Sequence, residues 1–174
     1  MVRAGAEVFE HASFWFDGGD GVLVLENGPS ALASAPGLFE ARLAARGGAR
    51  GELAERGVEA ASDLLALFLL GPDGIRRWVA GAPVLSDDHP YLAENGSSYD
   101  IEMAIRSVEP FLEDPAVLLA GTSSAAQIRA VRGTLLRLAA ASSSDRQKQV
   151  LDEGSAAAPG SALLRAWRRR LSVP

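Results

Sequence analysis

The alternation of hydrophobic and polar residues predicts a short helix followed by a β-hairpin at the start of the chain. Residues 2–11 have a helical pattern in which Val8 and Phe9 are apolar. Two strand-like runs, 12–16 and 21–26, flank the Asp- and Gly-rich stretch 17–20. Such a stretch between two apolar runs is typical of a hairpin turn. We therefore expect an antiparallel pair of strands over residues 12–27.

The pattern turns helical from residue 38 to residue 70. The clearest helix is predicted for Ala60–Leu70 and ends at Gly71-Pro72, a strong stop signal. Asp73 is the expected N-cap of a short helix that reaches Ala80. The glycines expected to divide the earlier part of this region into pieces are Gly47, Gly48, Gly51 and Gly57.

Later in the chain, Tyr91 and Leu92 indicate a short final strand, and helical periodicity follows over 99–111, 123–141 and 162–171. The stretches 142–144 and 154–160 have the composition of flexible connectors. We predict two parts, residues 1–96 and a helical tail over residues 97–174. Together these features predict an α+β fold.

Composition and charge exclude several classes of protein. The chain has 174 residues, a net charge of −5, no cysteine and two histidines. The negative charge argues against general nucleic-acid binding, and the absence of cysteine excludes disulfides and thiolate metal sites. We expect no metal site, because the two histidines lie far apart in sequence. No apolar run approaches the length of a membrane span, and an acidic residue interrupts the N-terminal stretch. A cytoplasmic protein is expected.

The glycine-containing loop 17–21 has a second interpretation, a phosphate or S-adenosylmethionine loop. Such a loop needs a strand before it and a helix after it. Here a strand-like valine run follows, so the sequence favours the hairpin turn. Trp15, Trp78 and Trp167 are interpreted as packing anchors. The C-terminal arginines are interpreted as a helix end, where cations are favourable; they are Arg165, Arg168, Arg169 and Arg170.

The stretch 86–90, Ser-Asp-Asp-His-Pro, holds the main candidate chemistry. Asp87 and Asp88 are adjacent carboxylates that are able to attract a cationic amine or take up a proton. They supply only an incomplete divalent-cation site, and they equally fit a turn in which aspartates accept backbone N–H bonds. His89 is either a general base or a turn residue held extended by Pro90.

The order of these stretches resembles spermidine-synthase-like (polyamine aminopropyltransferase-like) proteins, nearest to bacterial forms with a preceding membrane segment. The run 8–15, Val-Phe-Glu-His-Ala-Ser-Phe-Trp, is similar to their "VFPHV-x-LW". Residues 63–70 and 82–92 are similar to "DLLALFLL" and "APLNTDDRPYLE". The resemblance covers residues 2–95. Glu10 replaces a proline, His89 replaces an arginine, and Ala93 displaces the acidic Glu94 by one place.

The resemblance implies the terminal hairpin and short strand of a methyltransferase-like (Rossmann-type) domain, packed with helices. The family's cofactor loop and catalytic aspartate belong upstream, so no catalytic or cofactor-binding residue is assigned and no cofactor is expected. The candidate substrate-binding residues are Asp87, Asp88, His89 and Glu94. We expect that the chain lacks independent catalysis. We also expect that it binds an upstream synthase-domain partner or forms a homodimer. The alternatives are a helical interaction module and a small amine-binding protein.

Overall fold

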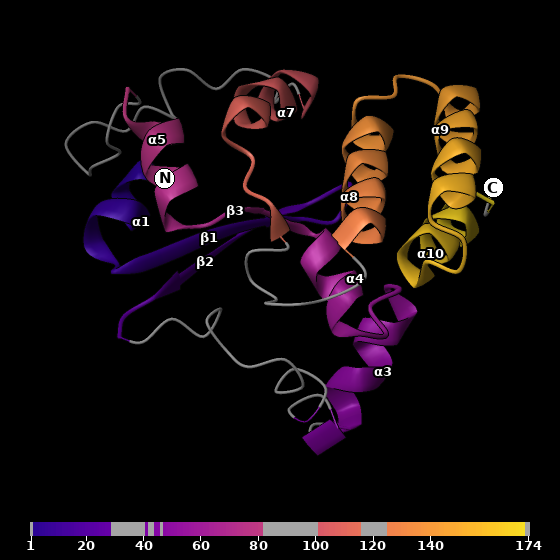
Figure 1. The fold of residues 1–174 in the computed structure, drawn as a ribbon, viewed down its shortest axis with the longest axis horizontal. Helices are drawn as coiled ribbons and strands as arrows, with labels where there is room; N and C mark the ends of the chain where they lie inside the picture. Colours follow the sequence, from indigo (N-terminus) through magenta and orange to yellow (C-terminus); the bar gives the residue numbers. More distant parts are fainter. Residues whose placement is uncertain are drawn as a thin grey trace. The chain divides into compact units, whose positions relative to one another are not determined.

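The computed structural model describes residues 2–28, 41, 44–45, 47–81, 101–115 and 125–172 (Figure 1). It confirms a mixed α+β fold that is rich in helix, with eight α-helices and one three-stranded sheet in this described part. The chain forms two compact units, each built from two segments. Unit 1 is Met1–Ser30 with Leu69–Glu113, and unit 2 is Ala31–Phe68 with Asp114–Pro174. The predicted division after residue 96 falls outside the described residues and stays a prediction.

The sheet contains the predicted hairpin. Strand β1, His11–Phe16, pairs antiparallel with β2, Gly21–Glu26, and the register is continuous from one end of the pair to the other. The third strand, β3, is Phe68–Leu70, and the strand order is β2-β1-β3. The β1–β2 part of the prediction is confirmed. The predicted strand at Tyr91 and Leu92 lies outside the described residues.

Two helices of unit 1 cover one face of this sheet. They are α1, Val2–Val8, and α5, Pro72–Val79. On the covered face, the Phe14 ring lies 5.7 Å from the Trp78 ring, centroid to centroid. Leu25 lies against Gly5 of α1, where a Cβ would meet its side chain at 3.0 Å. The unit also holds α7, Ile101–Val108, and the 3-10 helix η2, Glu109–Phe111.

The predicted helix Ala60–Leu70 is wrong over its last residues. Helix α4 covers only Ala61–Ala66, and the chain then enters β3, in which all three residues are buried. A short run of leucine and phenylalanine does not distinguish a buried helix from a buried strand by periodicity. Pairing with β1, which is remote in sequence, decides the outcome.

Unit 2 is helical, and its apolar side chains form one core. Its helices are α3, Gly47–Glu55, α4, α8, Ala125–Ala139, α9, Ser144–Ala157, and α10, Ala162–Leu171. Helix α8 supplies buried residues at helical spacing, and α9 and α10 supply a face each. The fully buried members include Ile128, Leu135, Leu138, Val150, Leu151, Leu163 and Leu164.

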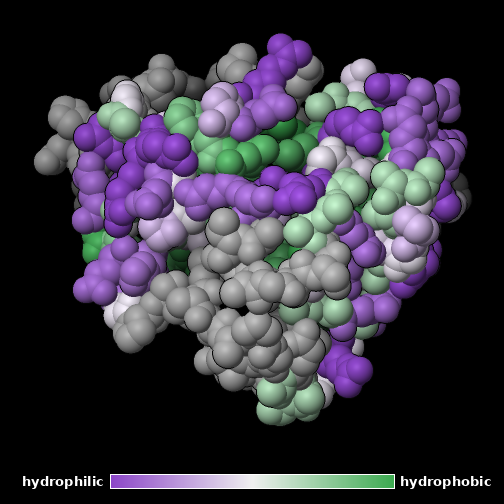
Figure 2. Space-filling model, viewed as in Figure 1, coloured by the Kyte–Doolittle hydropathy of each residue, from purple (hydrophilic) through white to green (hydrophobic). Residues whose placement is uncertain are grey.

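Helix α9 was not predicted from the sequence, and the expected flexible connector over 154–160 is wrong for residues 154–157, which belong to this helix. Its segment is mostly polar, and only Val150, Leu151 and Gly154 are buried, so the apolar signal is weak. The outer side of α9 is mainly hydrophilic in Figure 2. The predicted breaks at Gly48 and Gly51 are also wrong, because α3, which begins at Gly47, runs through both residues. Gly57 does end that helical region, with φ +87°.

Candidate functional site

The four predicted substrate-binding residues lie outside the described residues. Asp87, Asp88, His89 and Glu94 fall in the stretch 82–100, between the end of α5 and the start of α7. Whether the fold brings these side chains together therefore stays a prediction. The segments that lead into and out of this stretch both belong to unit 1.

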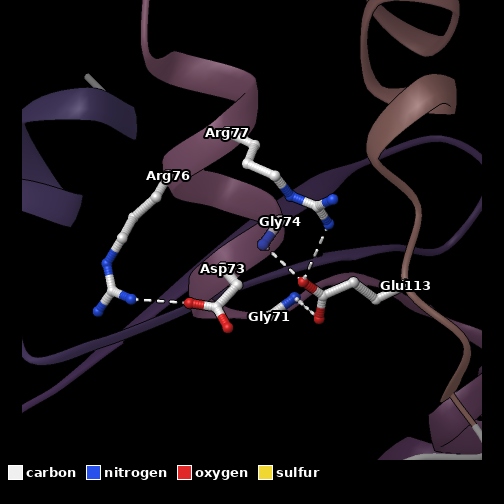
Figure 3. Close-up of polar contacts among 6 residues, drawn as sticks. All are labelled: Gly71, Asp73, Gly74, Arg76, Arg77 and Glu113. Carbon is white, nitrogen blue, oxygen red and sulfur yellow. Dashed lines mark hydrogen bonds and ion pairs between the residues drawn. The ribbon is translucent and has the colours of Figure 1, made fainter.

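The polar centre that the structure does describe in unit 1 is the start of α5. Glu113 follows η2, and its carboxylate accepts hydrogen bonds from the backbone N–H of Gly71 at 3.1 Å and of Gly74 at 2.5 Å (Figure 3). Its own backbone N–H donates to the Leu69 carbonyl at 3.0 Å. Glu113 therefore joins the end of β3 to the first turn of α5.

The contacts of Glu113 leave little room for another group at this helix start. At Gly74, a Cβ would lie 2.7 Å from the Glu113 Oε1 atom. Arg77 approaches the same oxygen at 3.9 Å from the next turn of α5. A carboxylate at a helix N-terminus satisfies free N–H groups and complements the helix dipole. We interpret this centre as a structural clamp rather than an open anion site.

No sequence pattern singles out Glu113, and Asp73 was the expected cap of α5. The structure places Asp73 within the first turn, where it pairs with Arg76 at 2.8 Å on the exposed side of the helix. The actual N-cap is Gly71, which has no capping side chain. A helix that starts at Gly-Pro without a local capping side chain indicates that its first N–H groups have an acceptor elsewhere in the chain. The sequence does not show which residue this is, because Glu113 lies 42 and 39 positions from the two glycines.

The glycine-containing loop is a hairpin turn, as the favoured interpretation held. Asp17 Oδ1 accepts from the N–H groups of Gly19 and Asp20, each at 2.9 Å. The Asp17 N–H donates to the Asp20 carbonyl, and Gly18 has φ +99°. The loop amides are thus engaged by the turn itself, and a strand follows. This geometry argues against a cofactor loop at this position.

The tryptophans and the C-terminal arginines make contacts within the protein. Arg168, Arg169 and Arg170 lie in the last turn of α10, as the helix-end interpretation expects, whereas Arg165 lies in its first half. Trp15 donates to Ser13 Oγ at 2.8 Å, and Trp78 donates to Ser107 Oγ at 3.3 Å. On α10, Arg168 pairs with Asp152 of α9 at 2.6 Å. Further contacts of this group are Arg170 over the Trp167 ring at 5.3 Å, Arg165 near Glu59 at 3.7 Å, and a hydrogen bond from Arg165 to the Gly160 carbonyl.

Strand β2 carries two of the exposed large hydrophobic residues in the described part of unit 1. It has one hydrogen-bonded neighbour, β1, so its other edge faces no strand of the described sheet. Val22 is 54% exposed and Val24 is 38% exposed. Both lie on the sheet face opposite α1 and α5, because they alternate with Leu23 and Leu25. This edge is a second candidate site, for a partner rather than a small molecule.

No protein-family model, curated protein or solved structure matches the chain. Within the described residues, no helix has the length and apolar character that crossing a membrane requires. The same part of the chain contains no group of three or more His, Cys, Asp or Glu side chains arranged to hold a metal ion.

Proposed function

We propose that this chain is the C-terminal portion of a spermidine-synthase-like domain, that it has no catalysis of its own, and that it acts with a synthase-type partner. The observation that carries the proposal is the sheet of the described residues, which has three strands and in which the outer edge of β2 pairs with no described strand. A sheet of this size with an exposed apolar edge is typical of a structure that another strand completes.

The placement of the similar stretches supports the proposal. The run that resembles "VFPHV-x-LW" begins at Val8, the last residue of α1, and continues into β1. A helix followed by a hairpin is the arrangement that the resemblance implies for this stretch. The run that resembles "DLLALFLL" occupies α4 and β3.

The proposed lack of independent catalysis is supported by two places in the described residues where a cofactor loop could be sought. The loop at Asp17 is a turn, and the helix start at Gly71 is already occupied by Glu113. Neither presents free N–H groups in the form that a nucleotide-type cofactor needs. The methyltransferase-like fold, the role of Asp87 and Asp88 in contacting an amine, and the cytoplasmic location are parts of the same proposal.

The test measures aminopropyl transfer to putrescine by the full chain, alone and mixed with a methyltransferase-fold protein encoded immediately upstream. We expect no transfer by the chain alone, transfer by the mixture, and co-purification of the two proteins. Turnover by the chain alone would contradict the proposal. A monodisperse monomer that captures no synthase-type protein would also contradict it.

Two further measurements separate the alternatives. Titration calorimetry with putrescine and spermidine addresses a small amine-binding protein, and Asp87→Asn with Asp88→Asn should abolish any heat. The absence of heat with millimolar amine would end that alternative. The packed helices α8, α9 and α10 favour a helical interaction module as the second candidate. It predicts that the helical unit captures a protein that is not of the synthase type.

A further inference from the structure

The outer edge of β2 has the features of a strand-accepting site. The β1–β2 register runs without a bulge from the His11–Glu26 pair to the Phe16–Gly21 pair. The strand Gly21–Glu26 contains no proline and no lysine. Natural sheet edges commonly carry bulges, prolines or lysines that prevent pairing with another chain. This edge lacks these three protections.

The side chains along β2 add an apolar strip to its outer backbone edge, which pairs with no strand in the described part of the chain. Val22 and Val24 point to the same face and are the exposed large hydrophobics of the sheet. The neighbouring Leu23 and Leu25 point to the opposite face, where a Cβ added at Gly5 of α1 would meet both side chains. An added strand with β-branched residues at alternate positions would cover the valines while its backbone pairs with β2.

The charges around this strip indicate the chemistry of the partner. Residues 1–30 contain five acidic residues and one arginine, Arg3, which is paired with Glu7 on α1. Exposed Asp20 precedes β2, and half-buried Glu26 ends it. Among the described residues, neither of these two carboxylates forms an ion pair. The strip is therefore apolar in its middle and acidic at both ends.

The same charges disfavour a second copy of this chain. Unit 1 as a whole contains 13 Asp and Glu residues against 4 Arg. Two copies that pair edge to edge through β2 would bring two acidic units together, and like charges suppress association. A segment with lysine or arginine at its ends would be attracted to the same edge.

We propose that the outer edge of β2 binds an extended segment of a partner protein by strand addition, and that this segment is basic at both ends and rich in β-branched residues between them. The proposal deepens the proposed function, on which it rests for the existence of a partner. It names the surface and the chemistry of the segment that occupies it.

The experiment uses the full chain and two synthetic peptides of alternating valine and threonine, one with lysine ends and one with glutamate ends. Backbone amide spectra and hydrogen exchange locate the bound peptide. We expect the lysine-ended peptide to perturb and protect the β2 amides. The glutamate-ended peptide should bind at least about tenfold more weakly at low salt, and the difference should shrink as salt is added.

Substitutions distinguish the contribution of charge to peptide binding from the contribution of strand pairing. The double substitution Asp20→Lys with Glu26→Lys should reverse the preference between the two peptides. Val24→Lys should weaken both peptides, whereas Val8→Lys should change neither, because Val8 is 72% exposed on α1, away from the strip. The amide spectrum of α5, which packs on the other face of the sheet in unit 1, reports whether this unit remains folded in each variant.

Three outcomes would overturn this proposal. They are an absence of β2 perturbation at millimolar lysine-ended peptide, equal binding of the two peptides, and a dimer of the chain in which β2 is already protected. None of them depends on aminopropyl transfer. A chain that is active with its partner but does not bind the peptide at β2 would leave the proposed function standing and remove this inference alone.

Discussion

At the scale of single residues, the buried polar side chains in the described part of the chain form hydrogen bonds with partners close in sequence. Thr134 donates to the Ala130 carbonyl at 2.8 Å, and Ser161 accepts from the Leu164 N–H at the start of α10. Ser13, which is 2% exposed, accepts from Trp15. Glu113 is different, because its two acceptor contacts reach a helix that lies far away in sequence.

Substitution of Glu113 tests its role as a clamp. Glu113→Ala leaves the N–H groups of Gly71 and Gly74 without their acceptor, and both glycines are buried. We expect a loss of about 2 kcal/mol in the free energy of unfolding, measured with urea. Asp73→Ala is the matched control. It removes an exposed ion pair with Arg76 and should change stability little. Equal effects of the two substitutions would contradict the clamp.

Asp63 makes the free energy of unfolding depend on pH. Burial raises the pKa of this carboxyl above its usual range, although the N–H groups of Glu59 and Ala60 donate to Oδ2 and partly oppose the shift. The Glu59 carboxylate also raises it, and Arg165 lowers it. The folded state therefore holds the proton more tightly than the unfolded chain. This group favours folding in acid, and its contribution falls as pH rises from the usual aspartate pKa through the folded-state pKa.

The prediction is tested by comparing the wild-type chain with Asp63→Asn. The isosteric amide keeps an oxygen for the two backbone donors but does not titrate. We expect the wild-type free energy of unfolding to fall relative to that of the variant as pH rises from about 4 toward about 7. Urea unfolding at a series of pH values measures this difference. A difference that stays constant or changes in the opposite direction would show that the carboxyl pKa is not raised.

At the scale of elements, the close approach of α8 and α9 depends on a small residue at the contact. Gly154 of α9 lies against Thr134 of α8, and a Cβ at Gly154 would overlap that side chain, whose Cβ is 2.9 Å from the added atom. The next residues of α9 toward its start at this interface are buried Val150 and Leu151. This contact explains why a helix with few apolar residues still packs onto the core.

A pair of glycine substitutions tests this packing. Gly154→Ala should destabilise the chain by about 1–3 kcal/mol, because α9 must move away from Thr134. Gly133→Ala is the matched control on α8, where an added Cβ meets nothing within 4 Å. It should stabilise by up to about 1 kcal/mol through helix propensity. Thermal and urea unfolding measure both. Destabilisation by both, or by neither, would contradict the proposed contact.

At the scale of the whole molecule, the two units differ strongly in charge. Unit 1 has the acidic excess described above, whereas unit 2 contains 13 Lys and Arg residues against 9 Asp and Glu. The net charge of −5 hides this difference. Charge of one sign concentrated on one unit directs which partners approach it. For unit 1 this favours basic partners, in agreement with the segment proposed for the β2 edge.

The sequence alone determined the elements whose signals are local. The hairpin followed from two apolar runs around an Asp- and Gly-rich turn, and the predicted helix over 162–171 coincides with α10. The predicted helices over 99–111 and 123–141 agree with α7, η2 and α8 within a few residues. In each case nearby residues supply the turn geometry or the apolar face that forms the element.

Only the tertiary structure decided the features that depend on remote partners. Phe68–Leu70 forms a strand because β1 is available for pairing, and α9 packs onto α8 because Gly154 leaves room for the Thr134 side chain. For the same reason, the carboxylate that accepts the hydrogen bond from the Gly74 N–H at the start of α5 belongs to Glu113 and not to the nearby Asp73. Periodicity and capping rules describe the chain within a few turns. These rules do not describe contacts between segments that are distant in sequence. Such contacts determine the free energy of forming β3, α9 and the cap of α5.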